Sequence, residues 1–290
     1  MRNRLRPTIS LFALVVLACS YVSCELINPE EQIPSFIRID SISLATGSSE
    51  GKPVENFTDA WVYDNEQLLG VYELPAIVPV LRQGDANIRI RAGIKLNGAV
   101  GTRIPYLFSE DYVKTIELFP DSQLHVNPTV TFKEGVTFDW LENFDNSATT
   151  TLSKTSQSQA EVERITGAES YDDASLKLAL DADQIIFECK MTGNGIDIPG
   201  GGTPSMLEFT YKCNNSFVVG LFSKDPGGTI QTSIISLKPS EDWNHIYVNL
   251  TDVVSSNPNY IAQNPFFGFI RDEGVEGEAF VIIDNIRMMH

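Results

Sequence analysis

The stretch DQIIFECKMTGNGIDIPGGGTPSMLEFTYKCNNSFVVGLFS, residues 183–223, decides the fold of this chain. Apolar residues recur in it at every second position, which is the spacing of a β-strand with one buried face. The Gly- and Pro-rich residues 192–204 interrupt that spacing and predict a loop. The apolar rows on either side of the loop are Ile185, Phe187, Cys189 and Met191 in the first strand and Leu207, Phe209, Tyr211 and Cys213 in the second. We therefore expect strands that share one core.

The same pattern extends in both directions from this stretch. Short alternating runs separated by Gly, Pro, Asn and Asp fill the chain from residue 36 to residue 289, and almost no segment has a helical period. Residues 146–160 are Ser/Thr-rich and nearly uncharged, which predicts a long exposed loop. Residues 251–264 are expected to hold one helical turn. The chain is therefore expected to be all-β.

The pattern of residue types changes near residues 133–137, and this change predicts a domain boundary. Six or seven short runs before it predict a small, Ig-like β-sandwich over residues 33–132. Nine runs after it predict a jelly-roll β-sandwich over residues 136–290. We expect each of these two fragments to fold alone.

Two local features of the first region are also predicted. Asp64-Asn65-Glu66-Gln67 separates two strand-like runs and predicts a tight hairpin turn. In residues 36–44 the apolar side switches from the row of Ile37 to the row of Ile42, and a β-bulge near Asp40-Ser41 would restore one buried face.

Both regions resemble known folds. VYDNEQLLGVYELP (62–75) and GDANIRIRAGIK (84–95) resemble the transthyretin-like and PEGA-like sandwiches of exported bacterial proteins. The second region resembles the galactose-binding-like jelly rolls of carbohydrate-binding modules. That resemblance is carried by WLENFDN (140–146), ITGAESYDDASLKLAL (165–180) and the closing VIIDNIRM (281–288).

The N-terminus has the features of a bacterial export signal. Three arginines in residues 1–10 precede an uncharged apolar run at 11–18. The run is shorter than the roughly 20 residues that a membrane-spanning helix needs. The Ser23-Cys24 junction resembles the lipobox of bacterial lipoproteins, which implies that Cys24 is diacylated. Cys19 is the alternative lipidation site, and an ordinary secretory signal is the alternative interpretation.

This interpretation divides the N-terminus into a signal peptide, residues 1–23, and an acidic tether, residues 24–32. The tandem acids Glu30-Glu31 resemble the export tags of surface lipoproteins in Bacteroidetes. We therefore expect a Bacteroidetes-type lipoprotein of the outer membrane. The lipid would anchor it on the periplasmic or the cell-surface side.

The charge balance limits the partners. The chain has 38 Asp and Glu against 21 Lys and Arg, a formal net charge of −17. Such a surface repels nucleic acid and anionic membrane. We expect no nucleic-acid partner, and contact with the membrane through the lipid anchor alone.

The sequence has no motif that indicates catalysis. It lacks a HExxH zinc motif and a phosphate-binding glycine loop, so we expect a non-enzyme. Cys189 and Cys213 are the cysteines outside the signal region, and both lie on predicted core-facing rows. Either they form one disulfide bridge or both are free buried thiols.

The resemblance to carbohydrate-binding modules implies a structural Ca²⁺ where the first and last strands lie side by side. The matching acidic residues are Glu142, Asp145, Asp172, Asp173 and Asp284. Carboxylate oxygens from several loops are the ligands that Ca²⁺ prefers. The alternative is that these residues cap their own turns or face solvent.

A candidate ligand-binding row lies in WNHIYVNL (243–250). Ile246, Val248 and Leu250 form the core row, which leaves Trp243, His245 and Tyr247 on the opposite face. Aromatic and polar side chains on an exposed sheet are suited to stacking sugars. The alternative is that a loop or the first domain covers the row.

Together these features predict a membrane-anchored envelope lipoprotein whose jelly roll is a non-catalytic binding module, with glycan as the expected ligand. Two alternatives remain open. One is a structural or assembly partner of an outer-membrane protein complex, without a small ligand. The other is a non-catalytic accessory subunit of a hydrolase.

Overall fold

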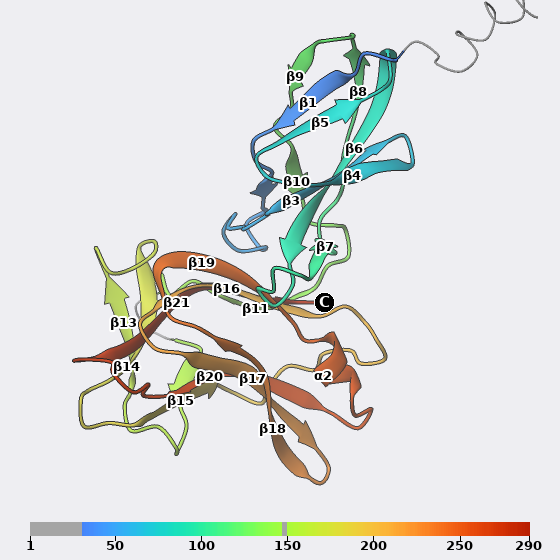
Figure 1. Cartoon of the computed structure of the whole chain (residues 1–290). Coiled ribbons are helices and arrows are strands. Elements are labelled where there is room, and N and C mark those ends of the chain that lie inside the picture. The colour runs from blue at the N-terminus through green and yellow to red at the C-terminus, as the bar shows by residue number, and fades with distance from the viewer. Residues whose placement is uncertain (1–30, 147–149) are drawn as a thin grey trace, which may run out of the picture.

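The computed structural model describes residues 31–146 and 150–290. Figure 1 shows two bodies of strands, one from each half of the chain. The predicted all-β fold is confirmed. Within the described residues, no helix combines the length and the apolar character that crossing a membrane requires. The expected signal peptide, with Cys19 and Cys24, lies outside the described residues.

The first domain is built from short strands. They are β1 (Ser35–Ile39), β2 (Ser43–Ala45), β3 (Asp59–Asp64), β4 (Gln67–Glu73), β5 (Ala76–Val80), β6 (Gly84–Lys95), β7 (Arg103–Pro105), β8 (Tyr112–Leu118), β9 (Gln123–His125) and β10 (Thr129–Thr131). One sheet has the order β4-β3-β6-β7, with β8 also on β6, and a second has the order β5-β1-β9. β2 pairs with β10.

The two local predictions for the first domain had different outcomes. The hairpin turn is confirmed: Asp64 pairs with Gln67, and Asn65 adopts the left-handed conformation with φ 52°. The bulge prediction is wrong. The chain leaves one sheet after Ile39 and joins another at Ser43, so Ile42 is buried by a change of sheet and not by a bulge.

The second domain is a sandwich of two sheets. Its elements are β11 (Phe138–Glu142), β12 (Leu152–Lys154), β13 (Val162–Thr166), β14 (Ala174–Leu180), β15 (Ile186–Met191), β16 (Met206–Cys213), β17 (Phe217–Asp225), β18 (Gly228–Leu237), β19 (Ser240–Asn249), helix α2 (Thr251–Ser255), β20 (Ala262–Ile270) and β21 (Ala279–Met289). Sheet I has the order β13-β14-β21-β16-β19, with β11 also on β21. Sheet II has the order β12-β15-β20-β17-β18.

The core of this domain lies between sheets I and II. The apolar rows predicted for β15 and β16 are buried in one cluster except at Ile185, which precedes β15 and is exposed. Cys189 and Cys213 are free thiols in different sheets. Burial raises the pKa of Cys213 to about 11 and raises that of Cys189 further. Residues 152–154, expected as part of a loop, instead form β12 at the edge of sheet II.

The two domains meet on the outer face of sheet I. Met206, Tyr247 and Met289 of the second domain are part of the first domain's buried cluster. The backbone of Leu96 forms a parallel bridge with Tyr247. The segment that links β2 to β3, residues 46–58, here called the clasp loop, lies against the same face, as its hydrogen bonds to β19 and β21 show.

A buried ion pair lies at the centre of this contact. Arg287 of β21 donates to the carboxylate of Glu208 in β16 at 3.0 Å, and the two side chains are 4% and 1% exposed. The first domain supplies their other partners. The Tyr106 hydroxyl donates to Glu208 at 2.6 Å, and the guanidinium of Arg287 donates to the carbonyls of Glu50 and Lys52 at 3.0 and 2.6 Å. The pair is therefore satisfied from both domains.

We predict that Arg287→Met lowers the free energy of unfolding by about 3–5 kcal/mol, because it leaves the charge of Glu208 buried and unpaired. Denaturant unfolding of the purified protein measures this. Arg38→Met is the control, because it breaks the exposed Arg38–Asp40 pair and should cost far less, since solvent screens that pair. Equal losses in the two variants would contradict the role of the buried pair.

Candidate functional site

The outer face of sheet I carries three successive rows of side chains. The strand register places Tyr247, Glu208 and Arg287 in one row and His245, Thr210 and Asp284 in the next. Ser175 of β14 extends the second row by donating to Asp284 at 2.8 Å. The third row contains Trp243, Lys212, Ile282 and Lys177. These rows differ in what covers them.

The first domain covers the row of Tyr247. The backbone N–H of Asn56 in the clasp loop donates to the Tyr247 hydroxyl at 2.8 Å, and the Asn56 amide donates to the carbonyl of His245 at 3.1 Å. Tyr247 is 2% and His245 8% exposed. The prediction that His245 and Tyr247 lie on an exposed ligand-binding face is therefore wrong for these two residues. They lie in the contact between the domains.

Trp243 lies in the row that the first domain leaves open. A pocket of about 280 Å³ borders it, lined also by Glu169, Lys177, Lys212, Glu278, Phe280 and Ile282. The ring of Tyr171 meets the indole edge-to-face, with centroids 5.2 Å apart. Lys177 is held in the pocket wall by ion pairs with Glu278 at 2.6 Å and Glu169 at 3.7 Å. The pocket thus combines an aromatic surface with fixed charged groups.

The acidic residues expected to bind calcium come from three segments near the other end of this face. Glu142 ends β11, and its oxygens accept hydrogen bonds from Phe144 at 3.0 Å and from Thr151 at 3.0 and 2.7 Å. Asp173 is exposed. Asp284 is buried in β21. The oxygens of Glu142 are therefore engaged by groups of its own loop.

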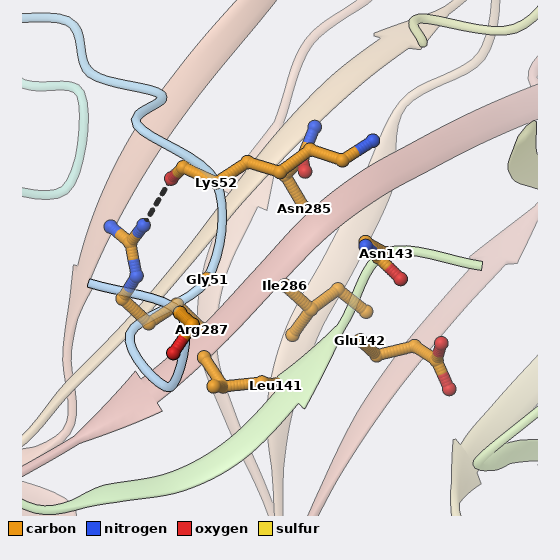
Figure 2. A pocket seen from close by; sticks show the side chains of 9 residues that line it. Gly51, Lys52, Leu141, Glu142, Asn143, Asn285, Ile286 and Arg287 are labelled. Carbon is orange, nitrogen blue, oxygen red and sulfur yellow. Dashed lines mark hydrogen bonds between the residues drawn. The ribbon is translucent and has the colours of Figure 1, made fainter. Parts of the chain in front are cut away.

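Asp145 and Asp172 share a cation that the chain itself supplies. The ammonium of Lys52 in the clasp loop lies 3.1 Å from Asp145 and 3.2 Å from Asp172. Figure 2 shows the neighbouring pocket of about 180 Å³, in which the Lys52 side chain extends past Asn285 while its carbonyl accepts from Arg287. Asn285 also donates to Asp172, at 3.2 Å.

This arrangement does not fit a calcium ion. Ca²⁺ takes six to eight oxygen ligands, whereas here an ammonium lies between the two carboxylates. In residues 31–146 and 150–290, no three or more His, Cys, Asp or Glu side chains are grouped so that they could hold a metal. The geometry therefore gives no support to the calcium prediction.

Asp284 is the carboxylate with a strongly altered proton affinity. Burial raises the pKa of Asp284 to about 6. Hydrogen bonds from the Ser175 hydroxyl and the Asn285 backbone act in the opposite direction, as does the charge of Lys52, while the charge of Asp172 adds to the rise. At neutral pH the buried carboxyl of Asp284 is therefore ionised in the folded protein, and this ionisation lowers the free energy of unfolding.

Sequence reasoning missed three residues of this face. Lys177 could have been found, because alternation along β14 places it opposite the buried Leu176 and Leu178. Tyr171 lies in the segment that carries the resemblance, but its contact with Trp243 depends on the fold of a turn. The sequence around Lys52 does not indicate its role, because its partner Asp172 is 120 residues away.

Comparison with known proteins gave matches by structure alone. No protein-family model matches the sequence, and no curated protein matches it. The CBM22-1 xylan-binding domain of Paenibacillus barcinonensis Xyn10C is similar to 54% of this chain over 96% of its own, with 9% identity and a TM-score of 0.37. A CBM28 module specific for non-crystalline cellulose has 12% identity and a TM-score of 0.38, covering 51% of this chain and 91% of its own.

The family 11 carbohydrate-binding module of the Clostridium thermocellum cellulase Lic26A-Cel5E is a third similar structure. It has 12% identity and a TM-score of 0.34, and the match covers 53% of this chain and 95% of that module. At these identities and TM-scores the matches carry no argument about what this chain binds.

We predict that Asp284→Asn removes a pH dependence of stability. The folded pKa near 6 lies above the ordinary value of 3.8, so the native state binds the proton more tightly than the unfolded state. The wild-type free energy of unfolding should then fall by on the order of 2 kcal/mol as the pH rises from about 4 to 6. Denaturant unfolding across this range should show a flatter profile for Asp284→Asn.

The control for this experiment is Asp173→Asn, which changes an exposed carboxylate of the adjacent turn. It should keep the wild-type slope between pH 4 and 6. The same slope in Asp284→Asn and in the wild type would show that another group causes the pH dependence.

Proposed function

We propose that this chain is a non-catalytic glycan-binding lipoprotein of a bacterial envelope, and that the pocket at Trp243 holds the glycan. The observation that carries the proposal is the aromatic pair of Trp243 and Tyr171 beside a rim of fixed charged groups. Sugar rings pack their C–H faces on aromatic rings, and their hydroxyls take hydrogen bonds from polar groups at the rim.

The charged rim suits hydroxyl ligands. Lys177 and Glu278 are paired at 2.6 Å, so they offer a donor and an acceptor side by side without an unpaired charge. The pocket volume of about 280 Å³ is at the small end of the range for ligand sites. A short saccharide unit therefore fits it better than a large cofactor.

The point at which the chain enters the first domain supports display from a membrane. The chain enters the first domain at the end away from the second domain (Figure 1). A lipid on Cys24 would then hold the Trp243 pocket away from the bilayer by about the length of the first domain. In this proposal the first domain acts as a spacer with a fixed orientation.

A second candidate function is docking to an envelope protein. Exposed apolar side chains flank β1 of the first domain: Ile77, paired with Arg38, is 53% exposed, and Phe119, whose carbonyl accepts from Ser35, is 55% exposed. If these side chains form one contiguous apolar surface, that surface would suit a protein partner, because single exposed apolar residues are common on any protein. Retention of an envelope protein by the wild type but not by Ile77→Asp would favour this function.

We predict that Trp243→Ala weakens glycan binding at least tenfold, because loss of an aromatic anchor costs about 2 kcal/mol or more. The mature chain is first screened on a panel of neutral and acidic oligosaccharides, and the affinity for the best ligand is then measured by titration calorimetry. Phe119→Ala, an exposed aromatic residue of the first domain, is the matched control and should bind as the wild type does. Failure of the wild type to bind any glycan, or unchanged binding in Trp243→Ala, would contradict the proposal.

We predict that Cys24→Ala abolishes lipid attachment, because the proposed lipid is bonded to the sulfur of this cysteine. The protein should leave the membrane fraction or accumulate unprocessed in a fractionated bacterial host. Cys19→Ala should remain lipidated and membrane-bound. If Cys24→Ala stays in the membrane with its lipid, Cys19 is the acylated residue.

A further inference from the structure

The clasp loop places a cation between two segments of the second domain. Asp145 lies after β11 and Asp172 lies between β13 and β14, and the ammonium of Lys52 contacts one carboxylate oxygen of each, at 3.1 and 3.2 Å. The buried carboxylate of Asp284 lies close enough for the charges of Asp172 and Lys52 to affect it. Two carboxylates that share one ammonium would repel one another without it.

The backbone at Lys52 and at the residue before it is held in place. Arg287 donates to the Lys52 carbonyl at 2.6 Å. Gly51 has φ +82°, and a Cβ on it would lie 3.3 Å from Leu141 and 3.4 Å from the guanidinium of Arg287. A side chain at position 51 would therefore be strained and crowded. The loop packs on β11 and β21, and this packing directs the Lys52 side chain toward the two carboxylates.

We infer that the ammonium of Lys52 takes the place of a metal ion where β11, the turn at residues 167–173 and β21 meet. This meeting point is here called the corner. The corner is then held by the first domain itself. Its stability depends on contact between the domains and not on dissolved calcium. This inference does not rest on glycan binding.

The same contact reaches the Trp243 pocket. Asp172 directly follows Tyr171, whose ring meets Trp243, and the Tyr171 backbone N–H donates to the Ser175 hydroxyl at 2.9 Å. By holding Asp172, Lys52 holds the turn that carries Tyr171. Lys52 is thus a positioning residue, and through Tyr171 the first domain supports the indole of Trp243, which lines a pocket on the second domain.

The test uses the mature chain with Lys52→Met, Asp172→Asn and both together, each melted in excess Ca²⁺ and in EDTA. We expect the wild type to melt at the same temperature in both solutions, and Lys52→Met to melt about 2–4 °C lower. The double variant should recover part of that loss, because it removes a carboxylate that has lost its cation. Lys52→Arg should keep most of the wild-type stability.

Hydrogen exchange supplies a readout that needs no ligand. The amide of Tyr171 should exchange faster in Lys52→Met than in the wild type, while amides in the core strand β20 should be unchanged. Calcium that raises the melting temperature of the wild type would overturn the inference. So would a Lys52→Met variant with wild-type stability and wild-type exchange at Tyr171, or strictly additive losses in the double variant.

Discussion

A charge buried on a sheet face must find its partners there, and this requirement sets the geometry of the molecule. Glu208 and Arg287 lie side by side on sheet I, but Glu208 also needs the Tyr106 hydroxyl, and Arg287 needs two carbonyls of the clasp loop. A docked domain in any other orientation would bury these groups without partners, at a cost of several kcal/mol. The interface therefore selects one arrangement of the two sandwiches as well as stabilising it.

That arrangement divides one surface into two uses. β19 presents Trp243, His245 and Tyr247 on the same side, at the spacing of a single strand face. The first domain packs on Tyr247 and closes over His245, while Trp243 stays beside an open pocket. The ligand site proposed here is thus the part of a continuous face that the neighbouring domain does not occupy. Its border is set by the clasp loop.

What the sequence could predict depended on the range of the interaction. Inward rows such as Phe187 and Leu207 follow from period-2 alternation, which is a property of a few neighbouring residues, and these were predicted correctly. The outward position of Tyr247 was also correct, but whether an outward residue meets solvent or another domain depends on packing. The same limit explains Lys52, which acts through partners in a different domain, and Ile42, whose burial comes from a change of sheet.

The two thiols of the second domain have a consequence for how its opening can be followed. Cys189 and Cys213 lie in separate sheets, and burial keeps both protonated at neutral pH. A thiol reacts with an alkylating or disulfide reagent as its thiolate, so neither reacts appreciably until the sandwich opens. The rate at which each thiol is labelled therefore measures how often the two sheets separate. Each sheet carries one of the two cysteines, so the two rates can be compared.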